Sequence, residues 1–430
     1  MKEILKEIIR TNQNRDFSDI RSRDLRIPIN AGKIITLIGP RRSGKSSLLQ
    51  FTIKELLRNG TKKDNILFIN FEDERLNFDQ SNLDLIIQAY RELYPDNNIE
   101  NCYFFFDEIQ NAEGWDRFIS RIFENISKNI FLTGSNAKFL SAEISTVLRG
   151  RAISYILFPL SFSEFLSFLS IEKDIYNVQN KALIINAFDN FLIWGGFPEL
   201  VNMESTLKTK VLQEYFNVMI YRDLIERFSI SDPHVLKYFI KKVIANITKP
   251  LSINRIYNEL KSNKYTIGKN SLYQFLDQVS DIFLVRLVNK FDYSQIRREQ
   301  YDKKAYIVDN GLISSVNYNL SNDYGKLLEN LIALEIQKNG YEVFFFKSLK
   351  ACDFIMKISD GFIPIQVSYT FYDNDTKNRE INGLLKASQV LDARQGYIIT
   401  FDLYEEIKKA ETKIHILPAY RFLLHDLKSF

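Results

Sequence analysis

Short apolar runs alternate with longer amphipathic stretches over residues 1–160. Each run holds about five to nine residues and is rich in Ile, Phe and Tyr, which is typical of buried strands. Between the runs, residues 46–60 and 83–95 place apolar side chains at helical spacing and end at Gly60 and Pro95. Strands that alternate with helices predict an α/β fold with a parallel sheet covered on both faces. The predicted strands are residues 34–39, 66–71, 102–109, 129–135 and 152–160.

The pattern changes twice after residue 160. It is mostly helical to about residue 228, and residues 252–309 then combine two helices with two apolar runs. Two helices followed by a two-stranded ribbon are typical of a winged helix-turn-helix. From about residue 323, one helix leads into three closely spaced strands. These changes predict four parts, which are residues 1–160, 161–230, 231–322 and 323–430.

The amino-acid composition excludes several classes of protein. Of 430 residues, 45% are hydrophobic and 26% are charged, which is close to the globular average and excludes a disordered chain. The two cysteines, Cys102 and Cys352, exclude a disulfide scaffold and a four-cysteine zinc site, and they predict a reducing, cytoplasmic location. No apolar run approaches the roughly 18 residues that a membrane helix needs. Because the first ten residues alternate charged with aliphatic side chains, we expect no secretory signal and no membrane partner.

The net charge of +4 conceals an uneven distribution. Residues 237–304 contain 14 Lys and Arg against six Asp and Glu, a balance of +8, so the rest of the chain carries −4. A basic segment on a mildly acidic chain indicates that a polyanion would bind there.

Residues 39–46, GPRRSGKS, match the phosphate-binding pattern G-x-x-x-x-G-K-[ST]. They lie between a predicted strand and a predicted helix, a context that disfavours a chance glycine-rich turn. The glycines let backbone N–H groups surround the β-phosphate of ATP, and the helix amino terminus adds its dipole. Lys45 is expected to reach the β- and γ-phosphates, and the Ser46 hydroxyl to hold Mg²⁺. The residues predicted to bind ATP are Gly39, Pro40, Arg41, Arg42, Ser43, Gly44, Lys45, Ser46 and Ser47.

Acidic and polar residues follow two other predicted strands. Asp107 ends a buried run, where a carboxylate is costly without a cation, so it fits a residue that holds the same Mg²⁺ through water, and Glu108 fits the general base. An ordinary acidic strand end is the alternative. Asn136 or Ser135 would contact the γ-phosphate or position the attacking water, although this T-G-S-N segment is also a simple turn signal. Arg151 is either an arginine finger that reaches the nucleotide of a neighbouring subunit in a homo-oligomer or a surface arginine.

Further motifs occur in a fixed order along nearly the whole chain. They are NFED at 70–73, FFFDEIQN at 104–111, LTGSN at 132–136, LRGR at 148–151, FPLSFSEFL at 158–166, WGGFPE at 194–199, YRDL at 221–224, GKLLENLIALE at 325–335, CDF at 352–354 and IPIQVSY at 363–369. Together with GPRRSGKS they resemble the prokaryotic AAA-type ATPases that carry a DUF4143 carboxy-terminal region. The resemblance implies a P-loop ATPase with a helical lid, a winged helix and a nuclease-like terminal domain. It also implies that Pro198 belongs to a lid element beside the nucleotide, and a tight break between helices is the plainer interpretation.

The terminal domain departs from the pattern that this resemblance implies. The nuclease-like fold that the resemblance implies places Glu329 and Asp353 where they would share a divalent metal, with a carbonyl or the Gln366 amide completing the shell of oxygen ligands. Ser368 stands where the catalytic lysine belongs, and serine carries no positive charge. Lys347 on a neighbouring strand is a candidate replacement. We therefore favour a degenerate nuclease fold over an active one.

The basic segment offers residues for DNA binding. Lys261, Lys264 and Lys269 surround the turn before the expected recognition helix, on which Tyr273 and Gln274 are candidates for base contacts. Arg297, Arg298, Lys303 and Lys304 are expected in the wing, where they would contact phosphates. A protein-docking module with solvated lysines is the alternative.

Three hypotheses follow from these patterns. The first is an ATPase switch whose nucleotide state controls a DNA-binding winged helix. The second is an ATP-regulated nuclease, against which Ser368 argues. The third is a non-catalytic nucleotide-binding scaffold for another protein. Glu108 and Arg151 favour turnover over binding alone.

Overall fold

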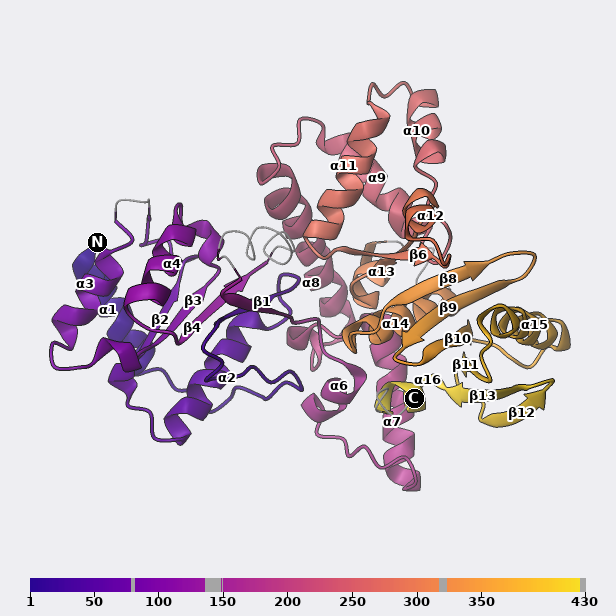
Figure 1. The fold of residues 1–430 in the computed structure, drawn as a ribbon, viewed down its shortest axis with the longest axis horizontal. Coiled ribbons are helices and arrows are strands. Elements are labelled where there is room, and N and C mark those ends of the chain that lie inside the picture. The colour runs from indigo at the N-terminus through magenta and orange to yellow at the C-terminus, as the bar shows by residue number, and fades with distance from the viewer. Residues whose placement is uncertain (79–81, 136–147, 149, 317–322, 426–430) are drawn as a thin grey trace. The chain divides into compact units, whose positions relative to one another are not determined.

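The computed structural model describes residues 1–78, 82–135, 148, 150–316 and 323–425. The chain forms two compact units, Met1–Leu157 and Phe158–Phe430, and each contains its own sheet (Figure 1). Within the described ranges, no helix is long and apolar enough to cross a membrane. The division into four parts stays a prediction.

The first unit is built on a five-stranded parallel sheet with the order β2-β3-β4-β1-β5. All five predicted strands are observed, and α2, α3 and α4 connect the first four of them. The elements are α1 (Lys2–Gln13), β1 (Ile34–Ile38), α2 (Lys45–Arg58), η1 (Lys63–Asn65), β2 (Ile66–Asn70), α3 (Leu85–Leu93), η2 (Ile99–Asn101), β3 (Tyr103–Asp107), η3 (Ile109–Asn111), α4 (Trp115–Asn125), β4 (Ile130–Gly134) and β5 (Ala152–Ile156).

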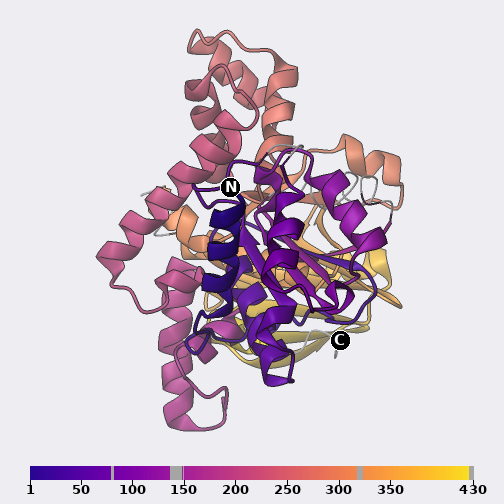
Figure 2. The same cartoon turned by 90° about the vertical axis from the view of Figure 1, so that its left-hand side faces the viewer.

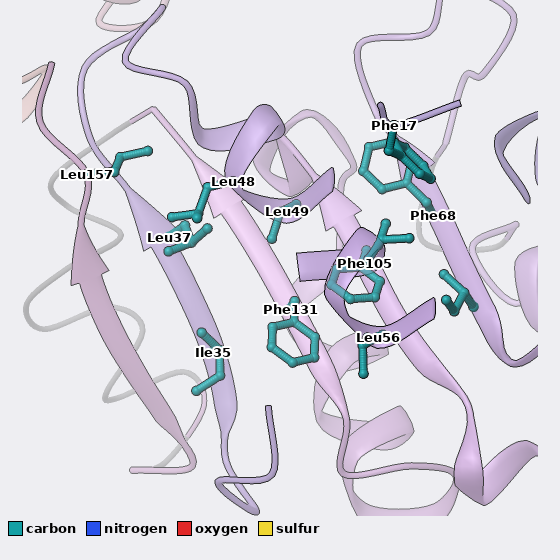
Figure 3. Packing of buried hydrophobic residues seen from close by; sticks show 12 residues of the cluster. Phe17, Ile35, Leu37, Leu48, Leu49, Leu56, Phe68, Phe105, Phe131 and Leu157 are labelled. Carbon is teal, nitrogen blue, oxygen red and sulfur yellow. The ribbon is translucent and has the colours of Figure 1, made fainter. Parts of the chain in front are cut away.

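Strand β3 explains why its apolar run is continuous. Phe105 packs in a cluster with Leu49 of α2 and Phe131 of β4, and its ring lies 4.7 Å from that of Phe131 (Figure 3). The next residue, Phe106, contacts Phe118 of α4, with ring centroids 5.9 Å apart. Because successive side chains of a strand point to opposite faces, both faces of β3 are covered, and its positions are apolar up to Phe106. Polar residues therefore appear where the strands end, at the carboxyl-terminal edge of the parallel sheet.

The second unit contains an eight-stranded sheet with the order β12-β13-β11-β10-β9-β8-β6-β7. Its elements are α6 (Phe162–Phe168), α7 (Val178–Trp194), η5 (Pro198–Leu200), α8 (Ser205–Val218), the π-helix η6 (Met219–Glu226), α9 (Pro233–Ala245), α10 (Ile253–Ser262), α11 (Lys269–Asp281), β6 (Val285–Lys290), α12 (Gln295–Gln300), β7 (Lys304–Ile307), α13 (Asn310–Val316), α14 (Tyr324–Lys338), β8 (Val343–Lys347), β9 (Ala351–Ile358), β10 (Gly361–Ser368), α15 (Asn374–Leu391), β11 (Gln395–Thr400), β12 (Glu405–Lys409), β13 (Thr412–Pro418) and α16 (Ala419–Leu424).

The predicted helix followed by three strands is observed as α14, β8, β9 and β10. The three strands pair antiparallel, and β11 then adds parallel to β10 after the crossover helix α15. Helix α14 contacts β10, β9 and β8, so its residues lie against the centre of this sheet.

The predicted order of two helices and a two-stranded ribbon is observed as α10, α11, β6 and β7. In both views α10 and α11 lie side by side with α9 at one end of the second unit (Figure 1 and Figure 2). The sequence did not predict that β6 also pairs in parallel with β8, through Asn289 and Phe344. The ribbon therefore belongs to the eight-stranded sheet and brings β7 to its edge.

Candidate functional site

The loop between β1 and α2 has the backbone that its glycines allow. Gly39 has φ +151°, and a Cβ at this position would lie 2.2 Å from the carbonyl oxygen of Leu157. Gly44 has φ +96° and precedes α2, whose first residue is Lys45. Both conformations are rare for residues with a Cβ. The glycines therefore hold the loop close around the amino terminus of α2, where backbone N–H groups are free to meet an anion.

Lys45 is buried and its ammonium group is held by the loop itself. Its Nζ donates to the carbonyl oxygens of Gly39 and Pro40, at 3.2 and 3.1 Å, and lies 3.5 Å from Oε1 of Glu108. The ammonium group of Lys45 therefore lies against the loop, and its acidic partner Glu108 directly follows β3. This is the place from which a lysine can reach a phosphate bound in the loop.

The acidic pair after β3 is organised by Thr133 of β4, a residue that the sequence analysis did not single out. Its hydroxyl donates to Oδ1 of Asp107 at 2.5 Å and accepts the backbone N–H of Glu108 at 2.8 Å. The motif L-T-G-S-N contained the signal, because a buried threonine at a strand end beside a carboxylate is a natural hydrogen-bond partner.

The two carboxylates have opposite electrostatic environments. Burial raises the pKa of Asp107, and hydrogen bonds from Thr133 and Ser46 only partly oppose it. Burial would also raise the pKa of Glu108, but Lys45 and the Gln110 side chain outweigh it, so that pKa is lowered. Glu108 is therefore held as an anion. A carboxylate kept ionised in a buried place is suited to bind a cation or to accept a proton.

Glu108 also has a strained backbone. Its φ is +50°, in the left-handed region, and the amide of Gln110 donates to its Oε2 at 2.5 Å. Such a conformation costs a non-glycine residue about 1–2 kcal/mol, so the surroundings must stabilise it. Here the hydrogen bond between its N–H and Thr133 does so. Strain of this kind is concentrated at functional sites.

One buried hydroxyl in the loop and one directly after β4 could bind an anion. Among the described residues, Oγ of Ser43 and Oγ of Ser135 are buried without a hydrogen-bond partner. Arg23 donates to the carbonyl oxygen of Ser43 at 2.8 Å, and Arg41 pairs with Glu72 at 2.9 Å, so further cations lie on or beside the loop. Buried donors without partners beside positive charge fit a phosphate group.

The remaining predicted residues of the first unit are placed as follows. Asn136 lies outside the described residues. Ser46 and Ser47 are in the first turn of α2. Arg151 forms an ion pair with Glu124 of α4, so its role as an arginine finger stays a prediction.

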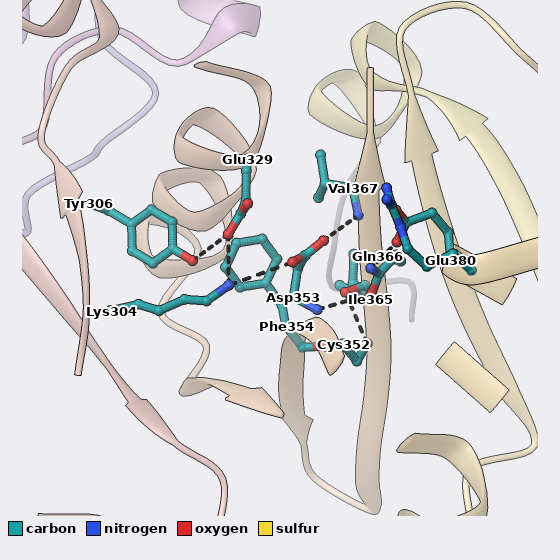
Figure 4. Close-up of polar contacts among 11 residues, drawn as sticks. Lys304, Tyr306, Glu329, Cys352, Asp353, Phe354, Ile365, Gln366, Val367 and Glu380 are labelled. Carbon is teal, nitrogen blue, oxygen red and sulfur yellow. Dashed lines mark hydrogen bonds and ion pairs between the residues drawn. The ribbon is translucent and has the colours of Figure 1, made fainter. Parts of the chain in front are cut away.

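The second unit brings Glu329 of α14 and Asp353 of β9 together, as the sequence predicted (Figure 4). The residue between them is Lys304 of β7, whose Nζ lies 3.0 Å from Oε1 of Glu329 and 3.6 Å from Oδ1 of Asp353. Tyr306 donates its hydroxyl to the same Oε1 at 2.9 Å. Burial raises the pKa of Glu329 to about 7, with Asp353 adding to the effect. Burial would lower the pKa of Lys304, but both carboxylates outweigh it and raise that pKa.

Gln366 links Asp353 to α15 through its side-chain amide. Its Oε1 accepts the backbone N–H of Asp353 at 3.0 Å, and its Nε2 donates to Glu380 of α15. The amide oxygen thus holds the backbone of Asp353, and its role as a metal ligand stays a prediction. Ser368 donates its hydroxyl to the carbonyl oxygen of Thr370 at 2.8 Å, and Lys347 ends β8 with an exposed side chain.

The expectation that Lys304 lies in the wing, where it would contact phosphates, is wrong. It begins β7 and only 8% of its surface is exposed. The signal was its place at the start of the apolar run A-Y-I-V-D, because a lysine that enters a buried strand needs an acidic partner.

The segment that was expected to form the wing contains a short helix. Arg297 and Arg298 lie in the six-residue helix α12 between the ribbon strands, not in an extended loop. Each has an acidic partner, with Arg297 3.3 Å from Asp292 and Arg298 3.4 Å from Glu342. These pairings reduce the positive charge that the wing offers to a polyanion.

The turn before α11 keeps its basic side chains. Lys261 and Lys264 are exposed, Lys269 begins α11, and its Nζ lies 5.9 Å from the ring centroid of Tyr273. Tyr273 and Gln274 are exposed on α11. This face of the helix pair therefore combines lysines with an aromatic and an amide side chain.

The GGFP segment has a partner that the sequence analysis missed. Asp309 is buried and accepts the N–H of Gly196 at 2.7 Å and the N–H of Gly311 at 2.8 Å. Burial raises the pKa of Asp309 to about 6, against those hydrogen bonds. Within the second unit the segment thus binds the end of the ribbon, and Pro198 begins η5 directly after it. Contact of Pro198 with a nucleotide stays a prediction.

Family models match most of the first unit and part of the second. Residues 31–166 match a family model described as an AAA domain. Residues 185–323 match a domain of unknown function, DUF8612, where the sequence resemblance implied DUF4143. The structure resembles a Walker-type ATPase of Pyrococcus abyssi (TM-score 0.40, 16% identity, 66% of this chain and 91% of that one). It also resembles the ORC1 protein of Aeropyrum pernix in complex with DNA (TM-score 0.32, 12% identity, 75% and 91%).

Two relatives match almost end to end. The uncharacterized protein MJ1544 of Methanocaldococcus jannaschii is 33% identical over 417 residues, which cover 94% of this chain and 91% of that protein. An uncharacterized protein of Haemophilus influenzae is 30% identical over 377 residues, which cover 87% of this chain and 90% of that protein.

Proposed function

We propose that this chain, which belongs to the same family as the MJ1544 protein of M. jannaschii and the protein of H. influenzae, binds and hydrolyses ATP with Mg²⁺. The observation that carries the proposal is the meeting of Lys45, Asp107 and Glu108 at one edge of the parallel sheet. The match of residues 31–166 to an AAA domain supports it. ATP hydrolysis then acts as a switch for the helices and ribbon that follow in the second unit.

The residues around the loop fit both ATP and Mg²⁺. The buried hydroxyl of Ser43 and the loop cations fit the phosphates, and Ser46 with Asp107 would hold the metal. When bound, Mg²⁺ neutralises phosphate charge. Lys45 leaves its contact with Glu108 for a phosphate oxygen, and Glu108, freed from that partner, accepts the proton of the attacking water. Thr133 keeps both acidic residues in position throughout. Arg151 of a neighbouring copy would add charge stabilisation in a homo-oligomer.

The first test is Lys45→Ala, measured as ATP binding by a fluorescent ATP analogue and as phosphate release. We expect binding to weaken at least 10-fold and turnover to fall below detection, because the phosphates lose a charge-assisted hydrogen bond from a buried cation. Lys62→Ala is the matched control, since this lysine is exposed in the turn after α2. If Lys45→Ala binds and turns over ATP like Lys62→Ala, the nucleotide site is not in this loop.

We further propose that α9, α10, α11 and the β6–β7 ribbon form a winged helix that binds DNA. The lysines at the α10–α11 turn would contact phosphates, and Tyr273 and Gln274 would face base edges. Because Arg297 and Arg298 have acidic partners, the turn contributes more of the binding than the expected wing does.

The DNA proposal predicts a steep salt dependence. In fluorescence anisotropy with a labelled duplex, we expect affinity to fall about 10- to 100-fold between 50 and 200 mM salt. Lys261→Glu/Lys264→Glu/Lys269→Glu should weaken binding further and flatten the salt slope, because three phosphate contacts become repulsive. Three exposed lysines of the second unit, Lys173, Lys408 and Lys409, changed to Glu give the same change in net charge as a control. Equal losses in both triple variants would show that only overall charge matters.

A further inference from the structure

Gln110 lies beside Glu108, two residues further along the chain. It belongs to η3, the short 3-10 turn that directly follows Glu108. The backbone N–H of Asn111 closes this turn on the carbonyl oxygen of Glu108 at 3.1 Å, and Ile109 at its start is fully buried. The turn is therefore anchored in the core, and it holds the Gln110 side chain against Glu108.

The carboxylate of Glu108 has a different partner at each oxygen. Its Oε1 lies 3.5 Å from Nζ of Lys45, and its Oε2 accepts a hydrogen bond from Nε2 of Gln110 at 2.5 Å. An ionised carboxylate can only accept hydrogen bonds, so the nitrogen of the Gln110 amide has to face it. The oxygen of the same amide is left for a different partner.

That oxygen, Oε1 of Gln110, is buried and has no hydrogen-bond partner among the residues that the structure describes. A buried acceptor without a partner costs free energy, and nearly all buried polar atoms of native proteins are satisfied. An exception beside a catalytic group therefore indicates a ligand that completes the hydrogen bonding. Because an amide oxygen only accepts, this ligand has to bring a hydrogen-bond donor or a cation.

The phosphates of ATP do not meet this requirement, whereas the attacking water does. Phosphate oxygens carry negative charge and accept hydrogen bonds, so they suit the donors Ser43 and Lys45 and would be repelled by Oε1 of Gln110. A water molecule has two O–H groups. When one of them faces Glu108, the second is available to the acceptor that lies beside Glu108.

We infer that Gln110 is a further catalytic residue, whose amide oxygen accepts a hydrogen bond from the attacking water while its amide nitrogen holds Glu108. This role rests on the ATP hydrolysis proposed above. The water oxygen bonds to the γ-phosphorus and one proton goes to Glu108. The bond to the β–γ bridging oxygen breaks with its electron pair, and ADP and inorganic phosphate are formed. Two fixed O–H groups leave a lone pair of the water for the phosphorus, which lowers the cost of reaching the reactive orientation.

The experiment compares Gln110→Met with the wild type in ATP turnover and in the binding of a fluorescent ATP analogue. Methionine has a similar length but can neither hold Glu108 nor accept a hydrogen bond from water. We expect kcat to fall about 10- to 100-fold, while KM and the affinity for the analogue stay within about threefold, because Gln110 contacts the water and not the nucleotide. Unchanged binding of the analogue also shows that the variant is folded. Gln88→Met makes the same change at an exposed position of α3 and should behave like the wild type.

The double variant Glu108→Gln/Gln110→Met distinguishes a role in catalysis from a role in the fold. Single-turnover measurements with radiolabelled ATP and excess protein follow its slow rate. Since both residues act on the same water, we expect it to be no more than about threefold slower than Glu108→Gln alone. The Mg²⁺ concentration that gives half-maximal turnover should be the same for Gln110→Met as for the wild type.

Three results would overturn the role of Gln110: turnover by Gln110→Met that equals that of Gln88→Met, losses that multiply in the double variant, or a higher Mg²⁺ requirement. The last would make the amide oxygen a metal ligand. If the wild type does not hydrolyse ATP, the proposed function fails and this role fails with it. If the wild type hydrolyses ATP and Lys45→Ala does not, a failure in the Gln110 series concerns Gln110 alone.

Discussion

Glu108→Gln is expected to reduce ATP turnover at least 100-fold while ATP still binds with wild-type affinity or better. The amide keeps the size of the side chain but cannot accept the proton of the attacking water, and a general base contributes about 10²–10⁴-fold to the rate. Binding should not weaken, because Lys45 loses a competing carboxylate that now lies 3.5 Å away. Phosphate release and the binding of a fluorescent ATP analogue measure the two effects separately.

Glu113→Gln is the control for this experiment. Glu113 is exposed, lies five residues beyond Glu108 in the same segment, and undergoes the same chemical change. We expect it to turn over ATP at the wild-type rate. If Glu108→Gln retains that rate too, another group accepts the proton, and the role proposed for Glu108 is wrong even when Lys45→Ala has abolished binding.

Gly195→Ala is expected to destabilise the second unit by about 4 kcal/mol. Gly195 has φ +71°, and a Cβ there would lie 1.8 Å from Oδ1 of Asp309. Asp309 cannot move away without losing its hydrogen bonds to Gly196 and Gly311, which would leave a buried carboxylate unpaired. The added methyl group therefore combines backbone strain with the loss of a buried polar contact.

The two tryptophans make this prediction measurable, because Trp115 lies in the first unit and Trp194 in the second. In a Trp115→Phe background, the fluorescence of Trp194 should report urea unfolding of the second unit at a much lower midpoint for Gly195→Ala. Gly340→Ala separates the two causes, since Gly340 has φ +82° but nothing lies within 4 Å of an added Cβ. It should cost only about 1–2 kcal/mol. Equal shifts in both variants would mean that contact with Asp309 does not matter.

Most of the first unit could be predicted from the sequence because its determinants are local. Each of the five apolar runs became one strand of the parallel sheet, since the inner strands of such a sheet are covered on both faces and are mostly apolar. The P-loop and the acidic pair Asp107-Glu108 follow their strands directly, so sequence order already places them at one edge. Thr133 was missed because its importance lies in a hydrogen bond across to the neighbouring strand.

The second unit was harder to predict because its key contacts join distant segments. Asp309 binds Gly196 across 113 residues, and Lys304 binds Glu329 across 25. The sequence showed a basic segment and counted Lys304 in it, because local composition cannot distinguish a solvated lysine from a buried one. Pairing of β6 with β8 carried the ribbon into the large sheet and its lysine to the carboxylates.

The sequence by itself determined the parallel α/β core, the phosphate-binding loop and the presence of a basic segment. These features depend on spacing within a few residues, on the covalent order of strand, loop and helix, and on side-chain charge, all of which are visible along the chain. Only the tertiary structure decided which charges are solvated and which are paired. The energy of a charge depends on its burial and on the groups within a few ångströms of it. For Lys304 those groups are Glu329 and Asp353, which become its neighbours only when the chain is folded.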